Sequence, residues 1–187
     1  LSSLAKRQEA AIEAPADFLS LAKKLRQMYQ IALLGLLRNQ ESNQQLAYMT
    51  RVFSRLEQIS GGTAMSPLWS IVAALVEGLR DQGIELSVSV KMMLGQVDRV
   101  LRQLVQGGAV HLQDAPPHEL LKNLLFYVAK ATHLSPRVRE VRERFRLDEA
   151  LPSEELINEE RARLQGPDQA AMNSVVQALS EELSKVK

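Results

Sequence analysis

The side chains best suited to chemistry in this chain are its three histidines, His111, His118 and His133. An imidazole can act as a general base or accept a phosphoryl group near neutral pH. A phosphoacceptor histidine needs an exposed position in the middle of a helix, with a lysine nearby and a small residue that admits the donor protein. None of the three has this setting, because His111 lies in a polar loop, His118 begins a predicted helix and His133 follows its end. We therefore predict no phosphoacceptor and no catalytic residue, with His133 as the least unfavourable candidate.

Four carboxylates near the C-terminal end are the next candidates, as a metal site or an acid–base pair: Glu154, Glu155, Glu159 and Glu160. Metal-binding bundles add a histidine three residues after such a glutamate, and none of these four has one. The chain has no cysteine, which excludes thiolate ligands and disulfides. It also lacks the glycine-rich and H-E-x-x-H motifs of phosphate-binding and zinc enzymes. We predict a solvated acidic face, no metal, no cofactor and no enzyme activity in this segment.

The strongest basic cluster consists of Arg137, Arg139, Arg142, Arg144 and Arg146. Such a cluster can bind phosphate, RNA or an acidic protein. Glu143 lies four residues after Arg139, and Arg144 lies four residues after Glu140, which favours a solvated helix with internal ion pairs. The net charge is only +1, and no aromatic residues lie among the arginines to stack on bases. We therefore expect a protein partner for this cluster rather than a nucleic acid.

Trp69 is the single tryptophan and lies in the first turn of a predicted helix. A position there favours partial burial in the core. Tryptophan is also enriched at the energetic centres of protein interfaces. We therefore keep Trp69, together with the arginine cluster, as a candidate partner-binding residue.

The elements that carry these residues are predicted to be helices. Apolar residues recur every three or four positions over residues 15–39, 41–60, 66–82, 87–106, 117–132 and 167–187, with shorter helices at 136–146 and from Ser153. Serine–proline steps at Ser66 and Ser135 provide N-caps, and glycines near 61, 83 and 107 end helices. No strand or hairpin pattern appears. The loops are short, so the sequence predicts an all-α antiparallel bundle.

The run Ile31 to Leu37, IALLGLL, predicts that the second half of the first helix is almost fully buried. It is too short to cross a bilayer, which needs about 20 apolar residues. We expect residues 1–15 to be a linker and 16–187 a single helical domain, with 136–187 either completing its core or connecting to a further domain. The chain starts at Leu1 and stops within a helical pattern, which indicates a piece of a longer protein. The absence of cysteine and of a signal-peptide core favours a cytoplasmic location.

Three stretches resemble a known family. They are LRQMYQIALLGLLRNQ (residues 25–40), ELLKNLLFYVAKA (residues 119–131) and RARLQGPDQAAMNSVVQALSEELSKVK (residues 161–187). They are similar to the N-terminal, phosphotransfer-like region shared by two groups of type IV pilus proteins. These are the ChpA (PilL-type) chemotaxis-like hybrid sensor kinases and the FimL scaffold proteins. The resemblance runs from about residue 20 to the end, and its motifs contain no catalytic residue.

The resemblance implies a relative of the four-helix histidine phosphotransfer bundle, with extra C-terminal helices. Active members carry H-x-x-K-G, and the nearest segment here is RLEQISG, from Arg55 to Gly61. Arg55 stands near the acceptor position, and no convincing His, Ser or Thr replaces it. The resemblance therefore implies a phosphotransfer-like domain that has lost phosphotransfer and acts in signalling that controls type IV pili and twitching motility.

The implied partners are CheY-like response regulators, pilus-pathway scaffold or polar landmark proteins, and other domains of the same chain. The exposed faces of the second and third helices and the arginine cluster would form the contact surface. Two alternatives remain open. One is an active histidine phosphotransfer domain in a phosphorelay, and the other is a module that binds an anionic partner through Arg137 to Arg146.

Overall fold

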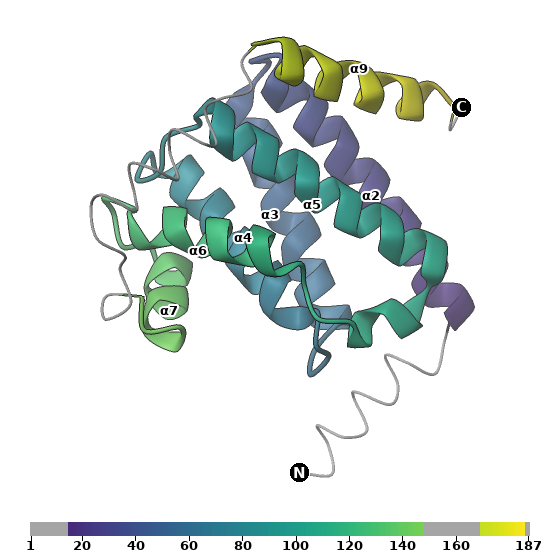
Figure 1. Ribbon diagram of the computed structural model, residues 1–187, viewed down its shortest axis with the longest axis horizontal. Helices are drawn as coiled ribbons and strands as arrows, with labels where there is room; N and C mark the ends of the chain where they lie inside the picture. Colours follow the sequence, from purple (N-terminus) through teal and green to yellow (C-terminus); the bar gives the residue numbers. More distant parts are fainter. Residues whose placement is uncertain (1–14, 148–168, 186–187) are drawn as a thin grey trace.

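The computed structural model of the chain describes residues 15–147 and 169–185. In these ranges every regular element is helical, which confirms the predicted all-α bundle (Figure 1). The elements are α2 (Pro15–Leu37), α3 (Ser42–Ile59), α4 (Ser66–Arg80), α5 (Val88–Gly107), the 3₁₀ helix η1 (Ala109–Gln113), α6 (His118–Ala129), α7 (Pro136–Arg144) and α9 (Gln169–Lys185). The predicted linker, the helix from Ser153 and the acidic residues Glu154, Glu155, Glu159 and Glu160 lie outside the described residues.

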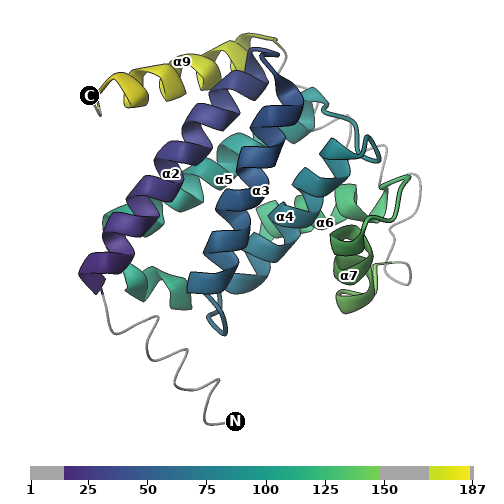
Figure 2. The same cartoon turned by 180° about the vertical axis from the view of Figure 1, so that it is seen from behind.

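Helix α4 is the central element of the bundle. It packs against α3, α6 and α7, and between Leu68 and Leu79 only Ser70 and Glu77 are not buried. Helix α2 packs against α3 on one side and α5 on the other (Figure 2). Helix α6 contacts both α4 and α5, so it lies between two helices that follow each other in the sequence. The bundle is therefore built around one apolar helix that its neighbours enclose.

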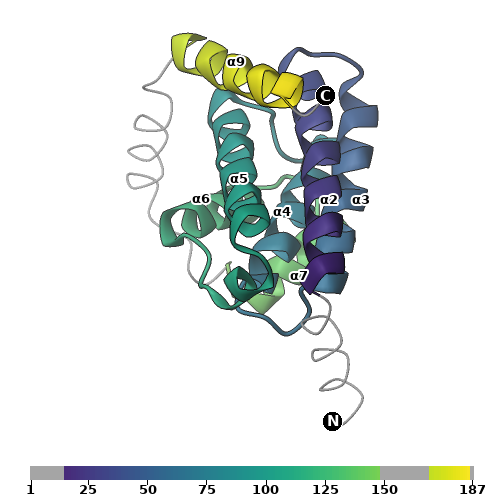
Figure 3. The ribbon, with the colours of Figure 1, turned by 90° about the vertical axis from the view of Figure 1, so that its right-hand side faces the viewer.

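The last two helices described, α7 and α9, pack on different parts of this bundle. Helix α7 contacts α4 and α6, whereas α9 contacts α2 and α5. Figure 3 shows α9 lying across α2 and α5 at one end of the bundle, away from α7. Both helices thus bury apolar residues against the bundle, but they contact different helices of it.

Three aromatic rings connect α2, α3 and α4 through the centre of the core. The ring of Tyr29 meets that of Phe53 edge-on at 5.2 Å, and Phe53 lies 6.2 Å from Trp69 in a stacked arrangement. Such pairs stabilise a core beyond the area that they bury. The buried polar ends are satisfied, because the Tyr29 hydroxyl donates to the Leu94 carbonyl at 2.5 Å and Trp69 Nε1 donates to Ser60 Oγ at 3.1 Å. Burial raises the pKa of the Tyr29 hydroxyl well above its usual value, and the nearby charge of Asp98 adds to this.

The helix ends follow the predicted signals in part. Ser87 caps α5 by accepting a hydrogen bond from the Val90 amide, and Gly108 ends the helix with a φ of 82°, a conformation that glycine accepts readily. Ser135 occupies the N-cap position of α7 but makes no capping hydrogen bond, and α4 begins at Ser66 itself. After α4 the left-handed residue is Gln82, with a φ of 62°, so Gly83 is not the helix stop that we expected.

The predicted near-complete burial of the second half of α2 is partly wrong. Leu33, Leu36 and Leu37 are buried, but Ile31 is 61% exposed and Met28 is 40% exposed. These two side chains lie on the side of α2 that faces away from the core, because the apolar run exceeds the stripe that a helix can bury. No helix within the described ranges is long and apolar enough to cross a membrane.

Candidate partner-binding surface

The arginine cluster lies on α7, and two apolar residues position this helix. Pro136 begins α7, where the missing amide hydrogen costs nothing. Val138 is fully buried and Val141 is 3% exposed, so this side of the short helix packs into the core beside α4 and α6. The polar residues of α7 are thereby divided between the seam with the bundle and the solvent.

Arg137 points into the seam with α3 and α4. Its Nη1 donates to Glu57 Oε1 at 2.6 Å and its Nη2 donates to Ser54 Oγ at 3.1 Å, both on α3. Its Nε lies 3.7 Å from Glu77 Oε2 on α4. One guanidinium group therefore joins three helices, an arrangement suited to its five fixed donors.

The acceptor side of this contact is also held in place. Ser70 on α4 donates to the second oxygen of Glu57, Oε2, at 3.1 Å. The Arg137 side chain is 30% exposed and that of Glu57 is 26% exposed, so the pair is partly screened from water. A charge-assisted hydrogen bond in such a setting is stronger than one on the open surface.

Arg142 also contributes to the structure, since its Nη1 donates to the Ala131 carbonyl at 3.3 Å. The remaining three arginines, Arg139, Arg144 and Arg146, are exposed. The guanidinium group of Arg144 lies 5.4 Å from the ring centre of Phe145, which supports it by a cation–π contact. The predicted basic cluster thus divides into two arginines that hold α7 and three that face solvent.

The expected ion pairs along α7 do not form. Within the described part of the chain, Arg139 is not paired with Glu143, nor Glu140 with Arg144. All four side chains are exposed, and exposed pairs at this spacing gain only a few tenths of a kcal/mol. The outward arginines are therefore not neutralised by their own helix.

Trp69 is in the core, which corrects its assignment as a partner-binding residue. The side chain is 0% exposed and lies against Phe53, with its indole nitrogen bonded to Ser60. A residue with no exposed surface cannot anchor a partner on this face. The alternative interpretation of the sequence, a core tryptophan, agrees with the structure.

The histidines lie at the edges of elements. His133 is exposed and follows α6, which ends at Ala129 and not near Thr132 as predicted. His118 is the exposed first residue of α6, and His111 in η1 places its Nδ1 2.6 Å from Asp114 Oδ2. None of the three lies in the middle of a helix, which is the setting that a phosphoacceptor needs.

The segment that the family resemblance compares with H-x-x-K-G forms the end of α3 and the turn after it. Arg55 is exposed and its Nη1 donates to Gln58 Oε1 at 3.0 Å. Two residues later, Glu57 binds Arg137. A guanidinium group stays protonated and cannot accept a phosphoryl group as a neutral imidazole does. The one hydroxyl in this segment belongs to Ser60, which is fully buried and accepts the hydrogen bond of Trp69, so the segment exposes no phosphoacceptor.

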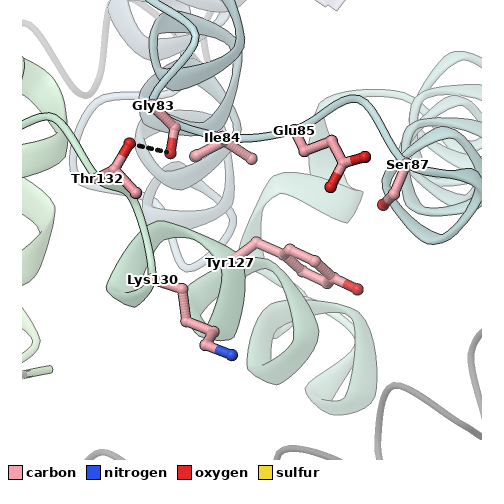
Figure 4. Close-up of a pocket in the computed structure, with 7 residues that line it drawn as sticks. All are labelled: Gly83, Ile84, Glu85, Ser87, Tyr127, Lys130 and Thr132. Atoms are coloured by element: carbon pink, nitrogen blue, oxygen red, sulfur yellow. Dashed lines mark hydrogen bonds between the residues drawn. The ribbon is translucent and has the colours of Figure 1, made fainter.

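The structure also contains a polar pocket that the sequence did not indicate. Its volume is about 280 Å³, and it lies between the loop from Gly83 to Ser87 and the end of α6. Figure 4 shows the Tyr127 ring extending toward the Ser87 end of this loop and the Lys130 side chain pointing away from the loop, while Thr132 donates to the Gly83 carbonyl at 3.3 Å. His133 does not line the pocket. Its walls come from segments at least 40 residues apart, which no local pattern reveals.

A second unpredicted cluster joins α2, α5 and α9. Arg26 donates from Nε and Nη2 to the two oxygens of Asp98, each at 3.2 Å, and Nη2 also donates to Glu182 on α9. Gln30 donates to the same Glu182 oxygen at 2.7 Å. Burial raises the pKa of Asp98, an effect that the hydrogen bond and charge of Arg26 only partly offset and that the charge of Glu182 reinforces.

Neither this cluster nor the rest of the described chain supplies a metal site. Among the residues that the structure describes, no three of His, Cys, Asp or Glu come close enough together to hold an ion. The exposed arginines of α7 and the groove that α2 and α5 form beneath α9 are the two surfaces considered below as binding sites.

Comparison with known proteins identifies the family. The family model of the second domain of the FimL scaffold protein matches residues 14–158. This is most of the chain, which therefore belongs to the FimL scaffold family.

The scaffold protein FimL of Pseudomonas aeruginosa is 42% identical to the chain over 166 residues, which cover 89% of the chain and 29% of that relative. The chain thus spans less than a third of the relative's length. No solved structure matches the chain. Both matches are to FimL scaffold proteins, which are one of the two groups that the sequence resembles. Neither match is to a sensor kinase.

Proposed function

We propose that this domain is a non-catalytic docking module within a scaffold protein, acting in the chemotaxis-like signalling that controls type IV pili and twitching motility. Membership of the FimL scaffold family supports the scaffold role. The pathway is the one that the family resemblance implies. The proposal also retains the cytoplasmic location and the CheY-like or pilus-pathway partners expected from the sequence.

The observation that carries this proposal is the contact between Arg137 and Glu57. In a phosphotransfer bundle the acceptor helix must leave its reactive side chain open to an incoming receiver. Here the corresponding part of α3 offers Arg55 in place of an acceptor, and Glu57 is bound by Arg137 from α7 at 2.6 Å. A phosphotransfer-like bundle that has lost its acceptor, with α7 fastened beside it, is suited to holding a partner rather than phosphorylating it.

The outward arginines of α7 are the surface that we assign to the partner. Arg139, Arg144 and Arg146 are exposed and carry no ion pair with the glutamates between them. Three such cations raise the association rate with an acidic protein surface and orient it during the encounter. We therefore expect an acidic face on the partner, with binding that weakens as the salt concentration rises.

The first test is phosphoryl transfer from a radiolabelled, phosphorylated CheY-like receiver of the pilus system to the purified chain. We expect no acid-labile label on the chain, while a known phosphotransfer domain in the same assay accepts the label. Acid-labile label that disappears in His133→Gln would overturn the proposal and establish an active phosphorelay domain.

The second test measures binding of the same unphosphorylated receiver, and of acidic scaffold proteins of the pathway, by titration calorimetry. The triple variant Arg139→Glu, Arg144→Glu, Arg146→Glu is expected to weaken binding at least tenfold. A matched triple reversal at Lys23, Lys24 and Arg80, which are exposed elsewhere on the bundle, serves as the control. Equal losses in both triples would mean that net charge alone matters, and the assignment of α7 would fail.

A further inference from the structure

The groove beneath α9 has the features of a binding site for a separate helix. The family model of the domain ends at residue 158, whereas α9 spans Gln169–Lys185. The groove itself is formed by α2 and α5, which lie within the matched domain. A helix beyond the range of the family model thus lies on two helices within that range (Figure 3).

The groove recognises α9 by a carboxylate and by apolar side chains at helical spacing. Glu182 accepts hydrogen bonds from Arg26 and from Gln30, and its other oxygen lies 3.4 Å from Arg102 Nη1. Three residues earlier, Leu179 is 5% exposed, and Val175 one turn before it packs against the core. The spacing 175, 179, 182 places all three on one face of the helix.

The receiving side is shaped for a close helix. Gly95 lies in the interior of α5, where glycine costs about 1 kcal/mol relative to alanine. A Cβ at this position would come within 3.3 Å of Val175 Cγ1, so the missing side chain makes room for α9. The glycine lies where α9 crosses α5, which indicates that this part of α5 is shaped to receive a helix.

One polar group of the groove, Arg26, has a partner within the bundle as well as on α9. Asp98 holds Arg26 through two hydrogen bonds within the bundle, so its guanidinium group stays directed to the groove when α9 is absent. An open pocket of about 210 Å³ also lies along the contact between α5 and α9, lined by Gly95, Gln96 and Ala178 among others. An arginine held within the bundle, beneath a helix with an open pocket along one side, is suited to exchange of that helix.

We propose that the α2–α5 groove is an exchangeable docking site for an acidic amphipathic helix of a partner protein, and that α9 is its occupant within the chain. The partner helix would present two apolar residues and a carboxylate at the spacing of Val175, Leu179 and Glu182, and it would bind by displacing α9. This surface is separate from the arginines of α7. The inference therefore stands or fails independently of the proposed function.

The test uses the full chain and a fluorescent peptide with the sequence of residues 169–185, followed by anisotropy. Glu182→Arg places a cation against Arg26 and Arg102 and should release α9 from its own groove. A tethered helix competes at an effective concentration in the millimolar range. The peptide should therefore bind the Glu182→Arg chain at least tenfold more tightly than the original chain.

Two matched controls define the site. Glu181→Arg makes the same charge change at the neighbouring exposed residue of α9 and should leave peptide binding as weak as in the original chain. A peptide that itself carries Glu182→Arg should not bind the released groove. Equal binding of both peptides, or equal binding to both chain variants, would overturn the proposal.

The position of α9 can be measured separately because the chain has no native cysteine. Spin labels on Gln96→Cys and Ala178→Cys, which line the same pocket, should move apart in the Glu182→Arg chain. Cross-linking these two cysteines should abolish peptide binding again. If α9 leaves and the peptide still does not bind, or if α9 stays docked, the groove is not an exchangeable site. Glu182→Gln provides a milder variant should Glu182→Arg prevent folding, and it is expected to bind the peptide with intermediate affinity.

Discussion

Arg137 on α7 donates a 2.6 Å hydrogen bond to Glu57 on α3, across 80 residues of sequence. The same guanidinium group reaches Ser54 on α3 and lies near Glu77 on α4. A helix of only nine residues has little stability of its own in water. This contact, with Val138 and Val141 beneath it, therefore decides where α7 lies.

Replacing Arg137 tests this structural role. Arg137→Ala leaves Glu57 and Glu77 close together without their cation, and we expect a loss of about 1–2 kcal/mol in the free energy of unfolding, less than for a buried pair because the side chains are partly exposed. Arg139→Ala on the same helix should change the free energy of unfolding by less than about 0.5 kcal/mol. Urea unfolding followed by circular dichroism measures both, and equal losses would contradict the division of the cluster.

Trp69 gives a direct readout of the core, since it is the single tryptophan. Its emission in the folded chain should be blue-shifted and should move to longer wavelength on unfolding, because the ring is fully buried. Trp69→Phe removes the hydrogen bond to Ser60 and leaves unfilled volume, at a cost of about 2–3 kcal/mol. Ser60→Ala keeps the ring and removes only the acceptor, so its cost should be closer to about 1 kcal/mol. Water-exposed emission from the native chain would show that the core assignment is wrong.

The helices were predictable because their signals are local. Apolar spacing of three and four residues predicted α2 to α7 within a few positions, and Ser87 and Gly108 fix the ends of α5. How the helices contact each other was not predictable. Helix α6 lies between α4 and α5 because α4 is apolar on nearly every side and must be enclosed, which follows from the whole composition of the bundle rather than from any one segment.

The binding surface was predictable only as a set of arginines. Whether an arginine faces inward or outward depends on its acceptors, and for Arg137 these lie on α3 and α4, far earlier in the chain. The cluster under α9 depends in the same way on residues 72 and 156 positions from Arg26. Pairings over such distances leave no periodic signal, which is why the sequence indicated neither the division of the cluster nor the groove.

Gly83 provides a test of close packing between the α4–α5 loop and the segment after α6. A Cβ at this position would lie 3.0 Å from the His133 backbone nitrogen and 3.1 Å from its Cβ. Gly83→Ala is therefore expected to cost about 1–3 kcal/mol by overpacking. Gly61→Ala is the matched control, because the nearest atom to its Cβ would be 3.7 Å away. Calorimetric melting curves compare the two variants, and a harmless Gly83→Ala would mean that this loop can shift.

The charge balance around Asp98 predicts how stability depends on pH. Arg26 and Tyr29 on α2 and Glu182 on α9 face this carboxyl, and its pKa is raised chiefly because burial disfavours the charged form. A raised pKa means that the folded state holds the proton more tightly than the unfolded state does. The contribution of Asp98 to stability is therefore present below its ordinary pKa of 3.8 and declines as the pH rises through the raised value.

Asp98→Asn isolates this effect, since the amide stays neutral at every pH. From acidic to neutral pH, we expect the free energy of unfolding of the original chain to fall relative to that of Asp98→Asn, and then to become constant above the raised pKa. Urea titrations across this range measure the difference. Glu182→Gln removes a charge that raises the pKa of Asp98, so in that background the decline should occur at lower pH. If the original chain instead gains stability relative to Asp98→Asn as the pH rises, the ion pair with Arg26 outweighs the cost of burying the carboxylate.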